Sequence, residues 1–154
     1  LALTRQAVPV LDRTELAAAS GAAKGAYVLS DEDDFEVILM ASGSEVAIAL
    51  DAAQQLRAEG TRVRVVSMPS HEWFDKQDDQ YKESVLPVTA RARVSIEAGS
   101  AMSWHRYVGT EGRCISLEHF GASADYQTLY REFGITSGAV VQAAHESIAA
   151  VQAL

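Results

Sequence analysis

The 154-residue sequence predicts an α/β fold of three layers, in which helices cover both faces of a five-stranded mixed sheet. Two observations favour this class. From residue 26 onward, short runs of β-branched and apolar residues alternate with longer stretches of helical spacing, which is typical of a mostly parallel sheet with right-handed crossovers. Two expected strands are separated only by residues 31–34, too few for a crossover, so one of the five strands is expected to be an antiparallel edge.

The chain is expected to open with a leader rather than with the sheet. Residues 1–24 contain Pro9, an alanine-rich stretch and no clear period, which indicates an extended connection with a short helix. Residues 26–30 and 35–41 are the first two expected strands, paired as a hairpin. The four acidic residues 31–34 between them are expected to be solvated, because like charges without a cation stay in water.

A helix is expected after residue 41. Ser42 and Glu45 stand three apart, as in a capping box, and Gly60 stands where the helix would end. The apolar side chains between them fall on one helical face. The remaining strands are expected at 63–68, 93–98 and 113–118, which brings the count to four parallel strands and one antiparallel edge. The remaining helices are expected around 78–86, 101–108, 123–133 and 138–152.

Composition excludes several classes of protein. The formal net charge is −8, and lysine and arginine are scattered rather than gathered into a stripe, so no nucleic-acid partner is expected. Apolar runs are far shorter than the roughly 18 residues needed to span a bilayer, and no signal peptide opens the sequence, so no membrane partner is expected. The single cysteine, Cys114, forms no internal disulfide, which favours a reducing, cytoplasmic location.

The carboxyl ends of the expected strands form the candidate binding edge, since open α/β sheets bind ligands there. Ser42, Gly43 and Ser44 follow one of these strands and begin a helix. Two interpretations stay open for them. Free amides at the helix start would bind a phosphate or carboxylate. Alternatively, Ser42 only caps the helix, Gly43 allows the tight turn, and Glu45 repels an anion.

No catalytic or metal-binding motif emerges from the residues themselves, and no metal ligand is predicted. His71-Glu72 and His145-Glu146 begin like zinc-protease helices, but the fourth position after each histidine holds Asp75 or Ala149. Cys114 lies in a strand pattern typical of a buried, inert thiol. The aromatic residues Trp73, Phe74, Trp104 and Tyr107 fit a core or a subunit contact better than a ligand platform.

A series of short motifs in a fixed order carries a family resemblance. They are LALTRQ at 1–6, GAYVL at 25–29, SGSEV at 42–46, VVSMPS at 65–70, FDKQ at 74–77, SVLP at 84–87, IEA at 96–98, Trp104 with Tyr107 and Gly109, FGASA at 120–124 and FGIT at 133–136. In this order, and over essentially the whole chain, the sequence resembles the C-terminal domain of transketolase.

The resemblance implies a division of labour. Residues 1–24 would end the preceding pyrimidine-binding domain and form a linker, and residues 25–154 would form the C-terminal domain. Arg5 matches the arginine that grips the substrate phosphate in transketolases, which suits the two parallel hydrogen bonds of a guanidinium. Transketolases of the pentose phosphate pathway are homodimers that use thiamine diphosphate with Mg²⁺ or Ca²⁺ to transfer a two-carbon ketol unit between phosphorylated sugars. No cofactor is expected in this chain, so it would be inactive alone and act through the preceding domains.

Two alternatives remain open at the level of sequence. The chain is a regulatory module that binds a small anion or a nucleotide at Ser42, Gly43 and Ser44, or it is the last domain of a related thiamine enzyme. The related enzymes are a deoxyxylulose-phosphate synthase and a two-oxoacid dehydrogenase β chain. VVSMPS followed by FDKQ fits transketolase better than either. The chain would be a piece cut from a longer enzyme rather than one chain of a split enzyme.

Overall fold

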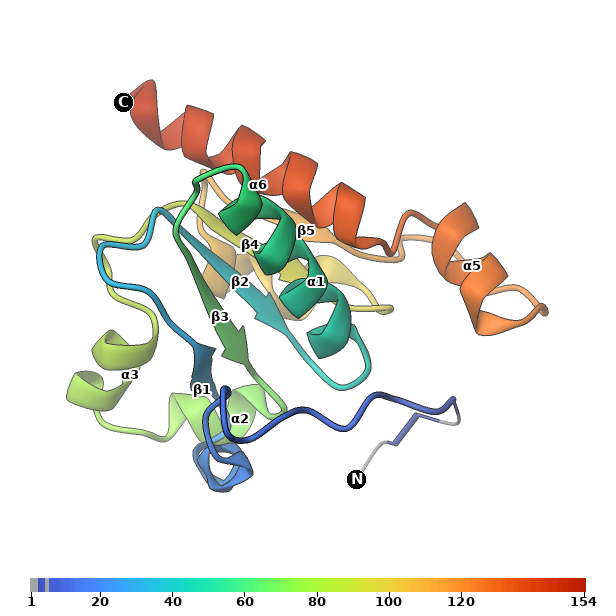
Figure 1. The fold of residues 1–154 in the computed structure, drawn as a ribbon, viewed down its shortest axis with the longest axis horizontal. Coiled ribbons are helices and arrows are strands. Elements are labelled where there is room, and N and C mark those ends of the chain that lie inside the picture. The colour runs from blue at the N-terminus through green and yellow to red at the C-terminus, as the bar shows by residue number, and fades with distance from the viewer. Residues whose placement is uncertain (1–2, 5) are drawn as a thin grey trace.

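The computed structural model describes residues 3–4 and 6–154, and a five-stranded sheet is its centre (Figure 1). The strand order is β1-β3-β2-β4-β5. Strand β1 runs antiparallel to its neighbour, and the other four strands are parallel. The expected class is therefore confirmed. The strands are β1 (Tyr27–Ser30), β2 (Val37–Ala41), β3 (Val63–Ser67), β4 (Arg93–Ile96) and β5 (Arg113–Ile115).

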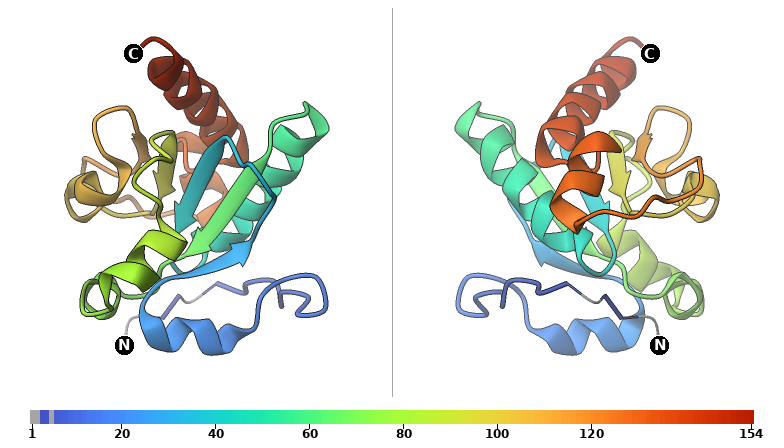
Figure 2. Two further views of the ribbon diagram at one scale, coloured as in Figure 1. Left: turned by 90° about the vertical axis from the view of Figure 1, so that its left-hand side faces the viewer. Right: turned by 90° about the vertical axis from the view of Figure 1, so that its right-hand side faces the viewer.

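Helices cover both faces of the sheet and divide the core in two (Figures 1 and 2). Helices α1 (Glu45–Ala58) and α6 (Ser137–Gln152) pack on one face. The opposite face is covered by α2 (His71–Asp75), α3 (Asp79–Val85) and α4 (His105–Val108), and the 3-10 helix η2 (Ala101–Ser103) comes just before α4. All five residues of β2 are buried, as expected for a central parallel strand with helices on both faces. None of the helices in the described part of the chain is long and apolar enough to cross a membrane.

Two elements lie outside these layers. The 3-10 helix η1 (Ala19–Lys24) belongs to the leader and contacts β1. Helix α5 (Tyr126–Glu132) and the loop before it project from one side of the molecule (Figure 1). We call residues 3–4 and 6–18 the leader strand and residues 117–130 the arm. Both are on the side toward which the carboxyl ends of the parallel strands point (Figure 1).

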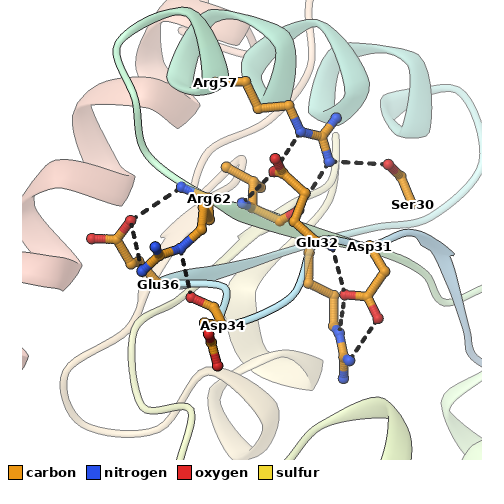
Figure 3. Close-up of polar contacts among 9 residues, drawn as sticks. Ser30, Asp31, Glu32, Asp34, Glu36, Arg57 and Arg62 are labelled. Atoms are coloured by element: carbon orange, nitrogen blue, oxygen red, sulfur yellow. Dashed lines mark hydrogen bonds and ion pairs between the residues drawn. The ribbon is translucent and has the colours of Figure 1, made fainter.

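The predicted hairpin between the first two strands is wrong. Strand β1 is an antiparallel edge as expected, but its neighbour is β3 and not β2. The acidic segment after β1 carries the chain across the amino end of β3, so β2 enters on the far side of β3. Arginine side chains from α1 and from the start of β3 receive this segment (Figure 3).

The acidic segment is mostly exposed, as predicted, but the expectation that it lacks cations is wrong. Asp31 forms a two-bond contact with Arg64, with both nitrogen–oxygen distances at 2.8 Å. Glu32 accepts a hydrogen bond from Arg57 Nε at 2.7 Å and another from the Val63 amide at 2.8 Å. The bond from Arg57, followed by that from Val63, lowers the pKa of the Glu32 carboxyl. The like charges are therefore held by cations that lie more than 20 residues away in sequence.

The same end carries a third arginine contact. Arg62 donates from Nε to the Asp34 carbonyl oxygen at 2.8 Å, and its amide donates to Glu36 at 3.1 Å. We call residues 31–36, together with Arg57, Arg62 and Arg64, the arginine clamp (Figure 3). It closes the amino ends of β2 and β3.

Several element boundaries differ from expectation. The helices expected around 78–86 and 138–152 are present as α3 and α6. The helix expected at 101–108 is instead two short helices, η2 and α4. Strand β5 and helix α5 are shorter than expected. The sequence did not predict α2. Ser70 marks the start of this helix, since its hydroxyl accepts a hydrogen bond from the Trp73 amide.

Candidate functional site

A crevice of about 500 Å³ lies at the carboxyl ends of β2 and β3. The leader strand and η1 form one wall, and the start of α1 forms the other. Its lining is mostly apolar, with Ser44 and Ser67 among the few hydroxyl groups. This is the sheet edge at which ligand binding was expected.

Ser42, Gly43 and Ser44 form the turn into α1, as the sequence indicated. Gly43 has φ +57, a left-handed conformation that glycine adopts without strain. The amide of Glu45 donates to the Ser42 carbonyl at 3.2 Å, and that of Val46 donates to the Gly43 carbonyl at 3.4 Å. The first two amides of α1 are therefore already hydrogen-bonded, which leaves fewer donors for an anion.

The predicted capping box does not form. Ser44, not Ser42, stands at the N-cap position, and its side chain makes no capping bond. Glu45 is only 5% exposed, and its carboxylate contacts Tyr130 at the base of the arm. Its carboxylate accepts hydrogen bonds from Ser44 Oγ at 2.8 Å and from the Tyr130 hydroxyl.

Tyr130 joins three parts of the chain at this point. Its hydroxyl bonds Glu45 and lies 3.3 Å from Ser44 Oγ, and it accepts a hydrogen bond of 3.3 Å from Gln6 Nε2 in the leader strand. Burial, and next the bond to Glu45, raises the pKa of the Tyr130 hydroxyl. Among the described residues, no cationic side chain forms a salt bridge with Glu45. We call Gln6, Ser44, Glu45 and Tyr130 the tyrosine cluster.

The tyrosine cluster changes what the crevice can bind. A buried carboxylate directly behind the first turn of α1 offsets the favourable helix dipole for a second anion. Arg13 lines the crevice, but its guanidinium donates to the Ala17 carbonyl at 2.6 Å. The geometry therefore favours a structural role for Ser42, Gly43 and Ser44.

A second group of ring side chains lies beyond the ends of β3 and β4. The His71 ring lies 4.6 Å from the Trp104 ring and 4.9 Å from the Tyr107 ring, centroid to centroid. Trp104 Nε1 donates to Glu97 at 2.7 Å, and the Tyr107 hydroxyl donates to Asp75 at 2.9 Å. Burial raises the pKa of Tyr107 to about 12 and lowers the pKa of His71.

These rings fill the second core rather than a binding surface. Phe74, Trp104 and Tyr107 are all buried, in agreement with the core interpretation, whereas Trp73 is 55% exposed. Cys114 is half-buried against this core, and burial raises the pKa of its thiol, which disfavours a nucleophilic role. In the part of the chain that the structure describes, no three His, Cys, Asp or Glu side chains are grouped to hold a metal ion.

Arg5, the predicted phosphate contact, lies outside the described residues. Its neighbour Gln6 is described and reaches the tyrosine cluster. Sequence reasoning missed the cluster because Tyr130 lies 85 positions from Glu45 and no spacing rule connects them. The one signal was Glu45 itself, a carboxylate next to a run of apolar helix residues.

Comparison with known proteins gives consistent matches. The family described as "Transketolase-like TK C-terminal domain" matches residues 25–136. The transketolase of Mycobacterium leprae is 51% identical over 151 residues, which cover 95% of this chain and 21% of the relative. The chloroplastic transketolase of Zea mays is 49% identical over 147 residues, which cover 94% of this chain and 21% of the relative.

Solved structures agree in fold. Transketolase from Leishmania mexicana superposes with a TM-score of 0.79 at 42% identity, covering 84% of this chain and 19% of that one. A transketolase mutant from Pichia stipitis superposes with a TM-score of 0.85 at 34% identity, covering 97% of this chain and 21% of that one. The chain thus spans about one fifth of the length of the relatives that it matches.

Proposed function

The chain belongs to the transketolase C-terminal domain family, and on this premise we propose that it works as the non-catalytic third domain of a transketolase. The observation that carries the proposal is the 51% identity over 95% of the chain to a protein about five times as long. The second support is the fold: the described residues form a five-stranded sheet between two apolar cores, and a solved transketolase superposes on it with a TM-score of 0.79. The regulatory-module alternative has no observation in its favour, because Glu45 lies behind its proposed site.

The activity proposed for the longer enzyme is transfer of a two-carbon ketol unit between phosphorylated sugars. Thiamine diphosphate with Mg²⁺ or Ca²⁺ would supply the carbanion chemistry. The residues of this chain do not fit that group, since no His, Cys, Asp or Glu side chains are grouped to hold its metal ion in the described residues. The cofactor would therefore be held by the preceding domains, in a homodimer. The proposed location is the cytoplasm, in keeping with a single cysteine.

The proposed division of the chain places residues 1–24 with the preceding pyrimidine-binding domain and residues 25–154 in the C-terminal domain. Two findings support this division. The family match begins at residue 25, and Gly25 has φ +86 where η1 ends and the path to β1 begins. The backbone of Phe74 would lie 2.2 Å from a Cβ atom at this position, so only glycine fits.

Arg5 is the residue proposed to act on substrate, by holding the phosphate of the sugar. Charged hydrogen bonds of this kind contribute about 1.5–3 kcal/mol each. In the longer enzyme, Arg5→Ala is expected to raise KM for phosphorylated sugars by about 10- to 100-fold, with cofactor affinity unchanged. Steady-state kinetics with a phosphorylated donor and with an unphosphorylated one measure this difference.

The control is Arg91→Ala, which removes an exposed arginine that pairs with Glu111 at the amino end of the sheet. It is expected to leave both KM values unchanged. An unchanged KM in Arg5→Ala would remove Arg5 from the site. Turnover by purified 1–154 with thiamine diphosphate and Mg²⁺ alone would contradict the proposed function itself.

A further inference from the structure

The crevice at the carboxyl ends of β2 and β3 holds two hydroxyl groups without a hydrogen-bond partner among the described residues. They belong to Tyr27 of β1 and Ser67 of β3, and both residues line the crevice. Tyr27 is 8% exposed and Ser67 is 9% exposed. By contrast, the Ser44 hydroxyl in the same crevice donates to Glu45. Because polar groups so deeply buried are almost always hydrogen-bonded, the pair indicates a partner from outside the described residues.

The backbone places these two side chains next to each other. Tyr27 and Ser67 are directly opposite in the antiparallel register of β1 and β3. Side chains at opposite positions lie on the same face of a sheet, with Cβ atoms about 4.5–5.5 Å apart. The 3-10 helix η1 lies directly on the Tyr27 ring, since a Cβ atom at Gly21 would be only 2.5 Å from Tyr27 Cγ. The ring is therefore held in place by η1, and the hydroxyl pair is pre-organised.

The walls around this pair are mostly apolar. They come from α1, from η1, from the leader strand and from the loop after β3, and they include Leu11, Ala22, Val46, Ala47 and Pro69. A water molecule in a buried site typically makes about three hydrogen bonds, and apolar walls leave it short of partners. A crevice of about 500 Å³ with apolar walls and a few convergent polar groups instead has the size and lining of a small-molecule site.

The charges around the crevice disfavour an ionic ligand. The Glu45 carboxylate lies behind the first turn of α1 and opposes an anion there. Arg13 lines the crevice and opposes a cation, and its guanidinium already donates to the Ala17 carbonyl at 2.6 Å. An ion that entered would lose much of its hydration, a cost that these two occupied side chains do not offset. The crevice therefore fits an uncharged molecule.

We propose that the crevice binds a small uncharged molecule, largely apolar, that carries one carbonyl group. The carbonyl oxygen has two lone pairs and accepts one hydrogen bond from the Tyr27 hydroxyl and one from the Ser67 hydroxyl. The apolar part of the molecule packs against α1 and the leader strand. The inference goes beyond the proposed function, because it gives the domain a binding site made only of its own residues.

Titration of benzamide into isotope-labelled 1–154, followed by NMR, tests the proposal. The chain has its own sheet and two cores, so it is expected to fold alone. Backbone amides of Ala22, Gly43 and Ala47 are expected to shift with a dissociation constant of about 1–10 mM, as the size of the probe allows. Benzoate has nearly the same shape and a negative charge, and it is expected to bind at least about tenfold more weakly. The absence of saturable shifts with benzamide, or equal binding of benzoate, would overturn the proposal.

Removal of each hydroxyl gives a second measurement. Ser67→Ala and Tyr27→Phe are each expected to weaken benzamide binding by about three- to tenfold, the usual effect of one neutral hydrogen bond. Tyr27→Phe keeps the ring that packs under Gly21. The matched controls are Ser103→Ala and Tyr126→Phe, at exposed positions outside the crevice lining, and both should bind benzamide like the wild type. Wild-type affinity in both Ser67→Ala and Tyr27→Phe would show that the hydroxyl pair holds no ligand.

A larger side chain in the wall tests the location of the ligand. Ala47→Leu adds apolar volume to the crevice from the first turn of α1 and is expected to weaken benzamide binding by at least about tenfold. Ala58→Leu, at an exposed position at the other end of the same helix, is the control and should leave binding unchanged. The NMR spectrum of each variant shows directly whether it is folded. Undiminished binding in a folded Ala47→Leu variant would place the ligand elsewhere and overturn the proposal.

Discussion

The two ends of the parallel strands are built differently. At the amino ends, the arginine clamp pairs carboxylates with Arg57, Arg62 and Arg64, so charges from distant segments satisfy one another. At the carboxyl ends, Glu45 is buried and forms no salt bridge with the residues that the structure describes, a crevice of about 500 Å³ stays open, and apolar side chains are exposed. The amino end is closed by ion pairs among the described residues, whereas the carboxyl end keeps an open crevice and exposed apolar side chains. The difference indicates which end carries stability and which carries contact.

The largest expected effect on stability comes from breaking the arginine clamp. Glu32→Ala removes the acceptor for both Arg57 and the Val63 amide and is expected to lower the free energy of unfolding by about 1–2 kcal/mol. The value stays modest because the Glu32 side chain is 34% exposed and water screens the pair. Urea unfolding of 1–154 measures it.

Asp33→Ala is the matched control for the clamp, because Asp33 is exposed and makes no hydrogen bond or salt bridge with the described residues. It should change stability by less than about 0.5 kcal/mol. The folded state lowers the pKa of Glu32, so its contribution is fully present above the ordinary value of 4.5 and is lost as the pH falls below it. Equal free energies of unfolding for the wild type and Glu32→Ala at neutral pH would show that the contacts of Glu32 in the clamp do not stabilise the fold.

At the carboxyl end, Tyr130→Phe removes the hydroxyl that joins Glu45 to the leader strand. It is expected to cost about 1 kcal/mol, because the buried carboxylate keeps only its bond from Ser44. The side-chain amide hydrogens of Gln6 should exchange faster, since they lose the Tyr130 hydroxyl as their acceptor. The control is Tyr126→Phe, whose hydroxyl makes no hydrogen bond with the described residues although its ring lies 5.9 Å from that of Tyr130. If both variants behave alike, the tyrosine cluster does not hold the leader strand.

His71, at the start of α2, is expected to have a smaller effect, on the pH dependence of stability. Burial lowers its pKa below the ordinary 6.5, while the charges of Glu97, Glu72 and Asp75 oppose the shift and that of Arg106 adds to it. The unfolded chain therefore binds more protons, so stability falls as the pH is lowered through 6.5. The half-buried ring limits this to below about 1 kcal/mol.

Replacement of the ring tests this pH dependence. His71→Gln should flatten the dependence of urea unfolding between neutral pH and about pH 5, above the range in which most carboxylates titrate. His105→Gln, a change at an exposed histidine of α4, serves as the control and should retain the wild-type slope. A wild-type slope in His71→Gln would assign the effect to other groups.

Features that depend on residues close together in the sequence were predicted, whereas features that depend on distant residues were not. The helices at 78–86 and 138–152 rest on local spacing, and both are present. The partner of β1, the clamp and the tyrosine cluster depend on contacts between residues 25 to 124 positions apart, for which no local pattern exists. The same reason explains the false capping box: Ser42 and Glu45 have the right spacing, but Tyr130 offers Glu45 a better donor within the fold.

The smallest expected effect is that of an anion at Ser42, Gly43 and Ser44. A ligand at 100 times its dissociation constant would stabilise the chain by about 2.7 kcal/mol. Thermal denaturation of 1–154 with phosphate, sugar phosphates or nucleotides is expected to show no such shift, because the amides of Glu45 and Val46 are occupied and the Glu45 carboxylate is buried behind them. Glu45→Gln sharpens the test: it removes the negative charge and keeps the shape of the side chain. A shift that appears only in this variant would show that Glu45 alone prevents anion binding. A shift in the unmodified chain would instead show that the carboxyl end binds an anionic ligand. The carboxyl end would then serve binding, and the amino end would serve stability.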